Sequence, residues 1–178
     1  MLVLTARLAA MLVRMLHTHH IAQINIGRTV AALDDPQLAG FVERLAEINA
    51  LADRSPGFVW RLQTEAGDAT SLTPFDDPRI IVNMSVWETL ETLHDYVYRS
   101  AHNQLLRQRK QWFEKFPGPY YALWWIRRGN IPTIEEAKQR LTHLANHGPS
   151  PEAFWFGTSF ADPPTNSPPL STSTPREP

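Results

Sequence analysis

HHIAQINIGR, residues 19–28, is the stretch that decides the fold. Its residues alternate in character, and a period of two is typical of a β-strand whose two faces meet different surroundings. One face is aliphatic, whereas the other carries side-chain amides. The two sets are Ala22, Ile24 and Ile26 on the first face, and Ile21, Gln23 and Asn25 on the second.

The segments after this strand predict the rest of the domain. Asp34 or Asp35 caps a helix that ends near residues 55–57, and later segments alternate or repeat at helical spacing. The predicted elements are strands at 58–64 and 79–87 joined as a hairpin, a long helix at 88–116 and a strand at 120–127. This order is the ferredoxin-like βαββαβ plan of the α+β class, a four-stranded antiparallel sheet with helices on one face. An extra C-terminal helix starts at Pro132 or Thr133 and runs to His147.

The chain of 178 residues predicts one domain, at 17–160, between two tails. Residues 1–16 form an N-terminal extension, which is either a start-site artefact or a targeting segment. Residues 161–178 are rich in Pro, Ser and Thr and predict a disordered tail.

Composition excludes several classes of function. The net charge is −1 and the basic residues of 98–113 scatter around a helix, so nucleic-acid binding is not expected. The chain has no cysteine, which excludes thiolate chemistry and fits a cytoplasmic location. Arg7 and Arg14 break the apolar run at the N-terminus, so no membrane span is expected.

Polar side chains point to a site in the middle of the sheet. In a ferredoxin-like sheet the first and third strands are central neighbours, and each has one face with polar groups. If those faces coincide, Gln23 and Asn25 meet Asn83 and Ser85. Buried amides need partners. The cluster therefore lines a ligand pocket, bonds internally in the core, or lies at a subunit interface.

On the long helix, His102 is the candidate for a general base, and His94 is a candidate substrate contact. His94 and His102 lie on the shoulder of its apolar arc, facing the crevice between helix and sheet. A histidine titrates near neutral pH, which suits proton transfer. The alternative is a half-buried structural histidine. Tryptophans that could wall such a pocket are Trp60, Trp87 and Trp125.

Other histidines do not indicate a metal site. His17, His19 and His20 are close in sequence, but strand alternation sends His20 to the opposite face. His143 and His147 have metal-ligand spacing, yet they lie in a last helical turn, where histidine is structurally favourable. No metal is predicted.

Six segments together resemble a bacterial family known as domain of unknown function 3291. The resemblance covers residues 18–157. The segments are HIAQINIGR, SPGFVWRLQTE, RIIVNMSVWE, YRSAHNQLLRQRKQWF, ALWWIRRGNIPTIEEAKQRL and HGPSPEAFWF.

That family is similar to the dimeric α/β-barrel superfamily, which includes antibiotic-biosynthesis and haem-degrading monooxygenases. The pattern that carries this likeness is Val86-Trp87-Glu88 followed by Ser100-Ala101-His102. The resemblance implies a homodimer that packs sheet against sheet through the aliphatic face. Haem-degrading members use an Asn, a Trp and a His, which Asn25, Trp87 and either His94 or His102 resemble. No cofactor is predicted, and haem is a remote alternative.

These observations lead to one functional hypothesis and its alternatives. The chain is expected to be a monooxygenase-like enzyme acting on a planar, oxidisable small molecule. His102 and Asn25 are the expected catalytic residues, and Gln23, Trp60, Asn83, Trp87, His94 and Trp125 are expected to contact the substrate. A non-catalytic binding module or a dimerisation domain on the same fold is the alternative.

Overall fold

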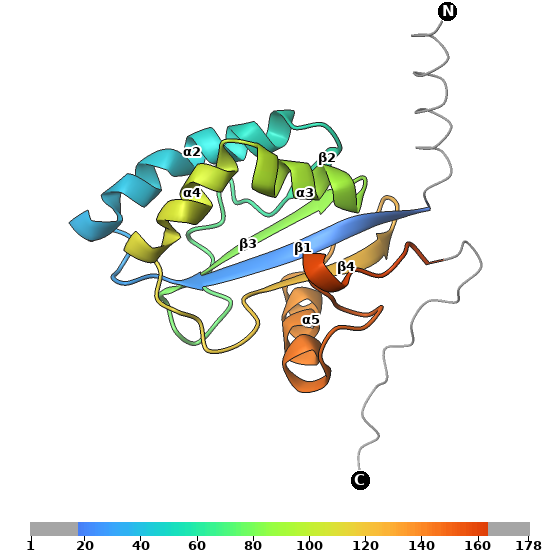
Figure 1. The fold of residues 1–178 in the computed structure, drawn as a ribbon. Helices are drawn as coiled ribbons and strands as arrows, with labels where there is room; N and C mark the ends of the chain where they lie inside the picture. The colour runs from blue at the N-terminus through green and yellow to red at the C-terminus, as the bar shows by residue number, and fades with distance from the viewer. Residues whose placement is uncertain (1–17, 164–178) are drawn as a thin grey trace, which may run out of the picture.

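The computed structural model describes residues 18–163 and contains one antiparallel sheet in the order β2-β3-β1-β4. This is the strand order of a ferredoxin-like fold, so the predicted fold class is confirmed (Figure 1). The elements are β1 (His19–Arg28), η1 (Pro36–Leu38), α2 (Ala39–Arg54), β2 (Phe58–Arg61), β3 (Ile80–Trp87), α3 (Leu90–Arg99), α4 (His102–Gln108), η2 (Arg109–Gln111), β4 (Tyr121–Arg127), α5 (Ile134–His147) and η3 (Phe156–Thr158). The predicted N-terminal extension and residues 164–178 of the predicted tail lie outside the described residues.

Helices cover both faces of the sheet. The predicted helices α2, α3 and α4 lie on one face, and the extra C-terminal helix α5 lies on the opposite face (Figure 1). Within the described residues, no helix is long and apolar enough to cross a membrane.

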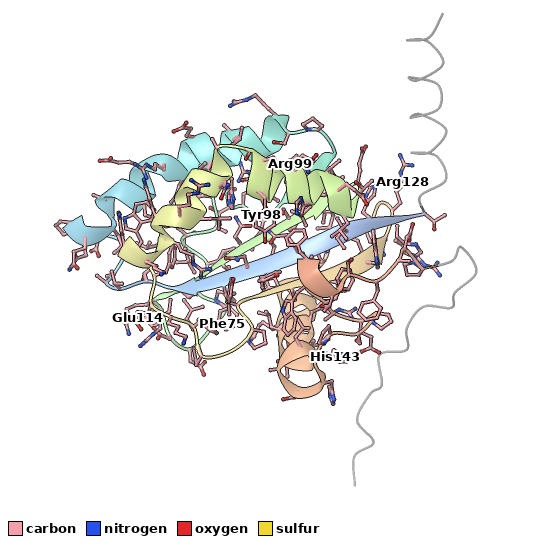
Figure 2. The ribbon with its side chains drawn as sticks, in the orientation of Figure 1. Phe75, Tyr98, Arg99, Glu114, Arg128 and His143 are labelled. Carbon is pink, nitrogen blue, oxygen red and sulfur yellow. The ribbon has the colours of Figure 1, made fainter. Side chains whose placement is uncertain are left out.

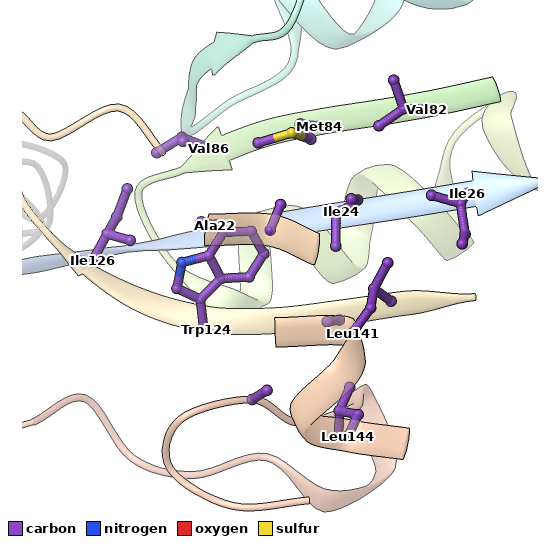
Figure 3. Packing of buried hydrophobic residues seen from close by; sticks show 13 residues of the cluster. Ala22, Ile24, Ile26, Val82, Met84, Val86, Trp124, Ile126, Leu141 and Leu144 are labelled. Atoms are coloured by element: carbon purple, nitrogen blue, oxygen red, sulfur yellow. The ribbon is translucent and has the colours of Figure 1, made fainter. Parts of the chain in front are cut away.

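The aliphatic face of the sheet is buried by the chain itself. Ile24 and Val86 have no exposed surface, and Ile26 and Val82 are nearly as deeply buried. Figure 3 shows these side chains packed with Leu141 and Leu144 of α5. Residues of β2 and of the β2–β3 segment complete the cover: Trp60, Leu62, Leu72 and Phe75.

This packing bears on the predicted dimer. The aliphatic side chains expected to meet a partner sheet are already covered, because α5 and the β2–β3 segment lie on them. A dimer formed on this side of the sheet must therefore use the covering residues. The homodimer itself stays a prediction.

The predicted long helix at 88–116 is wrong, because the chain leaves helical geometry at Ser100. Ser100 has an extended backbone, with φ −105° and ψ −178°. Its hydroxyl donates to the Tyr96 carbonyl and accepts from the His102 backbone N–H, so it ends α3 and begins α4. Serine competes in this way with the backbone hydrogen bonds of a helix. Because of this break, α4 runs over the sheet in a different direction from α3 (Figure 1).

A glycine connects α2 to β2 at a point where no side chain fits. Gly57 has φ +79°, and an added Cβ would lie 2.6 Å from atoms of the Thr92 side chain. Thr92 and Thr89 form the capping box that begins α3, so this contact fixes the start of that helix.

We expect Gly57→Ala to lower the free energy of unfolding by about 1–3 kcal/mol more than Gly129→Ala. Both glycines have a positive φ, but a Cβ at Gly129 meets nothing within 4 Å. Urea unfolding followed by tryptophan fluorescence measures both changes. Equal losses would show that Thr92 moves aside freely.

Candidate functional site

The polar groups of the central strands meet as their spacing predicts. Gln23 pairs with Ser85, and Asn25 with Asn83, in the β1–β3 register. The Gln23 side-chain Nε2 donates to Asn83 Oδ1 at 2.9 Å and to Ser85 Oγ at 3.0 Å. The Asn25 amide has no hydrogen-bond partner in the described part of the chain, although the residue is half-buried. Asn25 therefore keeps its N–H donors for another molecule.

A buried tryptophan contacts one end of the polar row, which consists of Gln23, Asn25, Asn83 and Ser85. The Trp87 indole N–H donates to Ser85 Oγ at 2.8 Å, and Trp87 is fully buried. Its ring stacks on Tyr96 of α3 at 4.8 Å between centroids. Ser85 thus accepts from both Gln23 and Trp87, which holds the Gln23 amide in place.

A cavity of about 380 Å³ lies between the sheet and the layer of α2, α3 and α4. Its size falls at the lower end of the range of small-molecule sites. Gln23, Asn25 and Asn83 line it from the sheet, and most of the remaining lining is aromatic or aliphatic. The aromatic lining residues are Phe41, Tyr96, Tyr98, Trp112, Phe113, Tyr120, Tyr121 and Phe156.

His102 lies in the cavity wall, at the first turn of α4. Its ring packs against Tyr96 at 4.9 Å, and burial lowers its pKa below the usual 6.5. His102 is therefore neutral at pH 7. Its Nδ1 lies 3.4 Å from the Val97 carbonyl oxygen, which can only accept. When Nδ1 donates there, Nε2 carries the lone pair that can take a proton.

Three tyrosines of the cavity lining are unsuited to act as bases at neutral pH. Burial raises the pKa of Tyr121 to about 12, and it also raises the pKa values of Tyr96 and Tyr98. Their hydroxyl groups stay protonated and can donate hydrogen bonds. His102 is the lining residue whose neutral side chain offers a basic nitrogen.

Four of the predicted substrate contacts do not line the cavity. Trp60 packs on the aliphatic face, and Trp87 is buried behind Ser85. Trp125 lies further along the sheet and donates its indole N–H to the Phe160 carbonyl. His94 does not line the cavity, but its ring contacts two residues that do, Tyr98 and Phe156. Of the two candidate histidines, His102 is the one in the lining.

Sequence reasoning missed several lining residues. Trp112 is buried like a core residue, but it also borders the cavity. Tyr121 pairs with Asn25 in the β1–β4 register, so strand alternation could have placed it beside the amides. Arg44 and Arg109 also line the cavity. Sequence spacing cannot find them, because a long arginine side chain can turn towards solvent or towards the interior.

A second cluster resembles a nucleophile with its base but lacks the supporting groups. On α5, His143 Nε2 lies 2.8 Å from Ser150 Oγ, and His143 Nδ1 lies 3.2 Å from Glu152 Oε2. Backbone N–H groups around Ser150 are already bonded, to Ala153 O and to Ser150 Oγ itself, so no oxyanion donor is evident there. This cluster lies across the sheet from Tyr98, and it anchors the segment after α5 (Figure 2).

The described residues do not form a metal-binding or haem-binding set. Among the described residues no group of three or more His, Cys, Asp or Glu side chains could hold a metal ion. The haem-related set is not assembled either, because Asn25 and His102 line the cavity but Trp87 does not. The residues present therefore do not fit the haem pattern.

The protein is thus a ferredoxin-like α+β domain with a cavity between its sheet and the helices α2, α3 and α4. The chain belongs to the family described as "Domain of unknown function (DUF3291)", whose model matches residues 20–169. Among curated proteins, none matches the chain significantly.

Solved structures with a related shape include SnoaB, described as a cofactor-independent oxygenase from Streptomyces nogalater. It is 18% identical, with a TM-score of 0.44, and the match covers 64% of this chain and 98% of SnoaB. A protein of unknown function from Nitrosomonas europaea, NE2512, is 10% identical with a TM-score of 0.42, over 66% of this chain and 96% of that one. Similarities of this size do not transfer an activity.

We expect Ser85→Ala to lower the free energy of unfolding by about 1–3 kcal/mol, because it leaves the buried Trp87 N–H without an acceptor. In a Trp87→Phe background the same change should cost much less, since no indole N–H is left unpaired. Denaturant unfolding of the four proteins of this double-mutant cycle measures the difference. The same cost in both backgrounds would contradict the role assigned to the Trp87–Ser85 bond.

The lowered pKa of His102 predicts how stability depends on pH. The folded protein binds this proton less readily than the unfolded chain, whose histidine titrates near 6.5. Stability is thus fully present above about pH 6.5 and is lost as the pH falls towards the folded pKa. The free energy of unfolding should fall more between about pH 7.5 and 5 in the wild type than in His102→Asn. Parallel curves would mean that His102 titrates normally.

Proposed function

We propose that this protein is a small-molecule oxygenase that needs no cofactor and oxidises a planar organic substrate in the cavity. The observation that carries the proposal is one space lined by both an unpartnered amide, Asn25, and a buried neutral imidazole, His102. An amide N–H stabilises a developing oxyanion, and an imidazole removes a proton. The aromatic walls suit a flat, apolar molecule.

The first step is formation of a substrate anion. His102 Nε2 takes a proton from an acidic CH₂ group of the substrate that is conjugated with a carbonyl group, directly or through an aromatic ring. The negative charge moves to the substrate oxygen, where the Asn25 N–H donates to it. Asn83 also lines the cavity, and its Oδ1 accepts from Gln23, which leaves its amide N–H group out of that bond.

The anion then supplies the electrons for oxygen. It reacts with O₂ to form a carbon–oxygen bond and a peroxide, which takes back the proton from His102. Loss of water from the peroxide leaves a carbonyl group, so that a CH₂ group and O₂ give C=O and H₂O. The substrate is the only reductant in this balance, so neither a cofactor nor an external electron donor is required.

Anthrone, a flat molecule with an acidic CH₂ group, is a suitable probe because its oxidation gives anthraquinone and water. We expect the protein to speed oxygen uptake from anthrone solutions above the uncatalysed rate. His102→Asn should lower kcat/KM by about 100-fold or more, and Asn25→Ala by a similar factor. His94→Asn is the matched control, because His94 does not line the cavity, and it should change little. An oxygen electrode and the anthraquinone absorbance provide the two readouts.

The pH dependence separates catalysis from mere binding. The value of kcat/KM should rise with pH through the pKa of His102, which lies below 6.5. Unchanged turnover in both His102→Asn and Asn25→Ala would refute the mechanism. Anthrone binding without any acceleration of oxygen uptake would instead favour the non-catalytic binding module. The cavity itself argues against a purely structural dimerisation domain. The cytoplasmic location stays a prediction.

A further inference from the structure

Two arginines place positive charge at one end of the cavity. Arg44 projects from α2 and Arg109 from η2, and both line the cavity. Arg44 Nη1 donates to Gln108 Oε1, so the two helical segments meet there. The Arg44 guanidinium carbon lies 5.5 Å from the centre of the Trp112 ring, and that of Arg109 lies 4.5 Å from the centre of the Tyr120 ring. Aromatic rings that line the cavity therefore hold both cations in position.

Neither of these arginines pairs with a carboxylate in the described part of the chain. Other arginines of the domain do have acidic partners. Those pairs are Arg28 with Asp77 and Glu114, Arg61 with Asp53, Arg79 with Glu114, Arg99 with Asp95, and Arg140 with Glu136. Among the described arginines without a carboxylate partner, Arg44 and Arg109 line the cavity.

The rest of the lining does not neutralise this charge. Asp68 is the one acidic residue among the lining residues. Its Oδ1 already accepts from the backbone N–H and the hydroxyl of Thr70, and these two bonds hold the Asp68 side chain in its loop. The lining contains two arginines, Arg44 and Arg109, and one carboxylate, Asp68, which is already hydrogen-bonded. The charge of the lining is therefore positive, although the whole chain has a net charge of −1. Such a field favours an anionic ligand.

We propose that the substrate is an aromatic carboxylate, with its carboxylate held by Arg44 and Arg109 and its rings between the aromatic walls. The planar guanidinium group matches a carboxylate in two parallel hydrogen bonds. The lining has no glycine-rich loop of the kind that cradles phosphate, which favours the carboxylate. The inference rests on the proposed function, because it names the substrate class of the same cavity.

In this proposal the two ends of the cavity have different roles. The arginines bind a carboxylate that does not react, and the amides with His102 act on the oxidisable part of the molecule. Binding energy from a remote group can orient the reacting centre in this way. Arg44 and Arg109 are therefore binding residues that select the substrate.

The test compares 2-naphthoate with 2-naphthamide, which have the same ring system and nearly the same shape but differ in charge. Binding of each probe to the full chain is measured by titration calorimetry, without oxygen turnover. We expect the wild type to prefer 2-naphthoate. Arg44→Gln and Arg109→Gln should each weaken 2-naphthoate binding by about 10- to 100-fold and change 2-naphthamide binding little. Arg44→Lys keeps the charge but loses the paired geometry, so its effect should be intermediate.

Arg107→Gln is the matched control, because Arg107 lies on α4, is exposed and does not line the cavity. It should leave both affinities unchanged, and circular dichroism checks that every variant is folded. Equal affinity of the wild type for both probes, equal losses for both probes in the variants, or binding of neither probe would overturn the inference. Preference for 2-naphthoate together with no acceleration of oxygen uptake, either from anthrone or from an anthrone that carries a carboxylate group, would instead contradict only the oxygenase proposal.

Discussion

The register between β1 and β3 is the constraint on which the site depends. Both faces of these central strands are covered, one by α5 and the other by α2, α3 and α4. A slip of β1 by one residue would turn Gln23 and Asn25 into the aliphatic core and turn Ile24 towards the cavity. Burying the amides there without partners would cost several kcal/mol. The same hydrophobic burial that stabilises the sheet therefore also aligns the amides of two strands into one polar row.

A break in the chain after α3 shapes the space above that row. A continuous helix would keep its apolar arc against the sheet and leave little room. Instead Ser100 ends α3, and the chain after η2 returns to the end of β1, where the Val30 N–H donates to the Trp112 carbonyl. Phe113 packs so closely on Gly27 that a Cβ there would lie 2.7 Å from its ring. These contacts close one end of the cavity and bring Trp112 and Arg109 to its edge.

Burial gives the groups of the cavity different chemical roles. It lowers the pKa of His102 and raises the pKa of Tyr121, so at neutral pH the imidazole accepts protons and the phenol donates hydrogen bonds. In the described part of the chain, aromatic rings rather than carboxylates contact the guanidinium groups of Arg44 and Arg109. A proton acceptor, neutral donors and two arginines thus line one space, and this combination supports the proposed binding and deprotonation of an organic acid.

The sequence by itself determined the order of the elements, the two faces of β1 and the meeting of Gln23 with Asn83 and Ser85. These features follow from short-range periodicity and from the few topologies that the element order allows. Only the tertiary structure decided that His102 rather than His94 lines the cavity, that Trp87 bonds to Ser85 behind the amides, and that Arg44 and Arg109 border the cavity. Periodicity tells which side of an element a residue occupies. The helix break, the covering layers and the neighbours of a long side chain decide what that side meets.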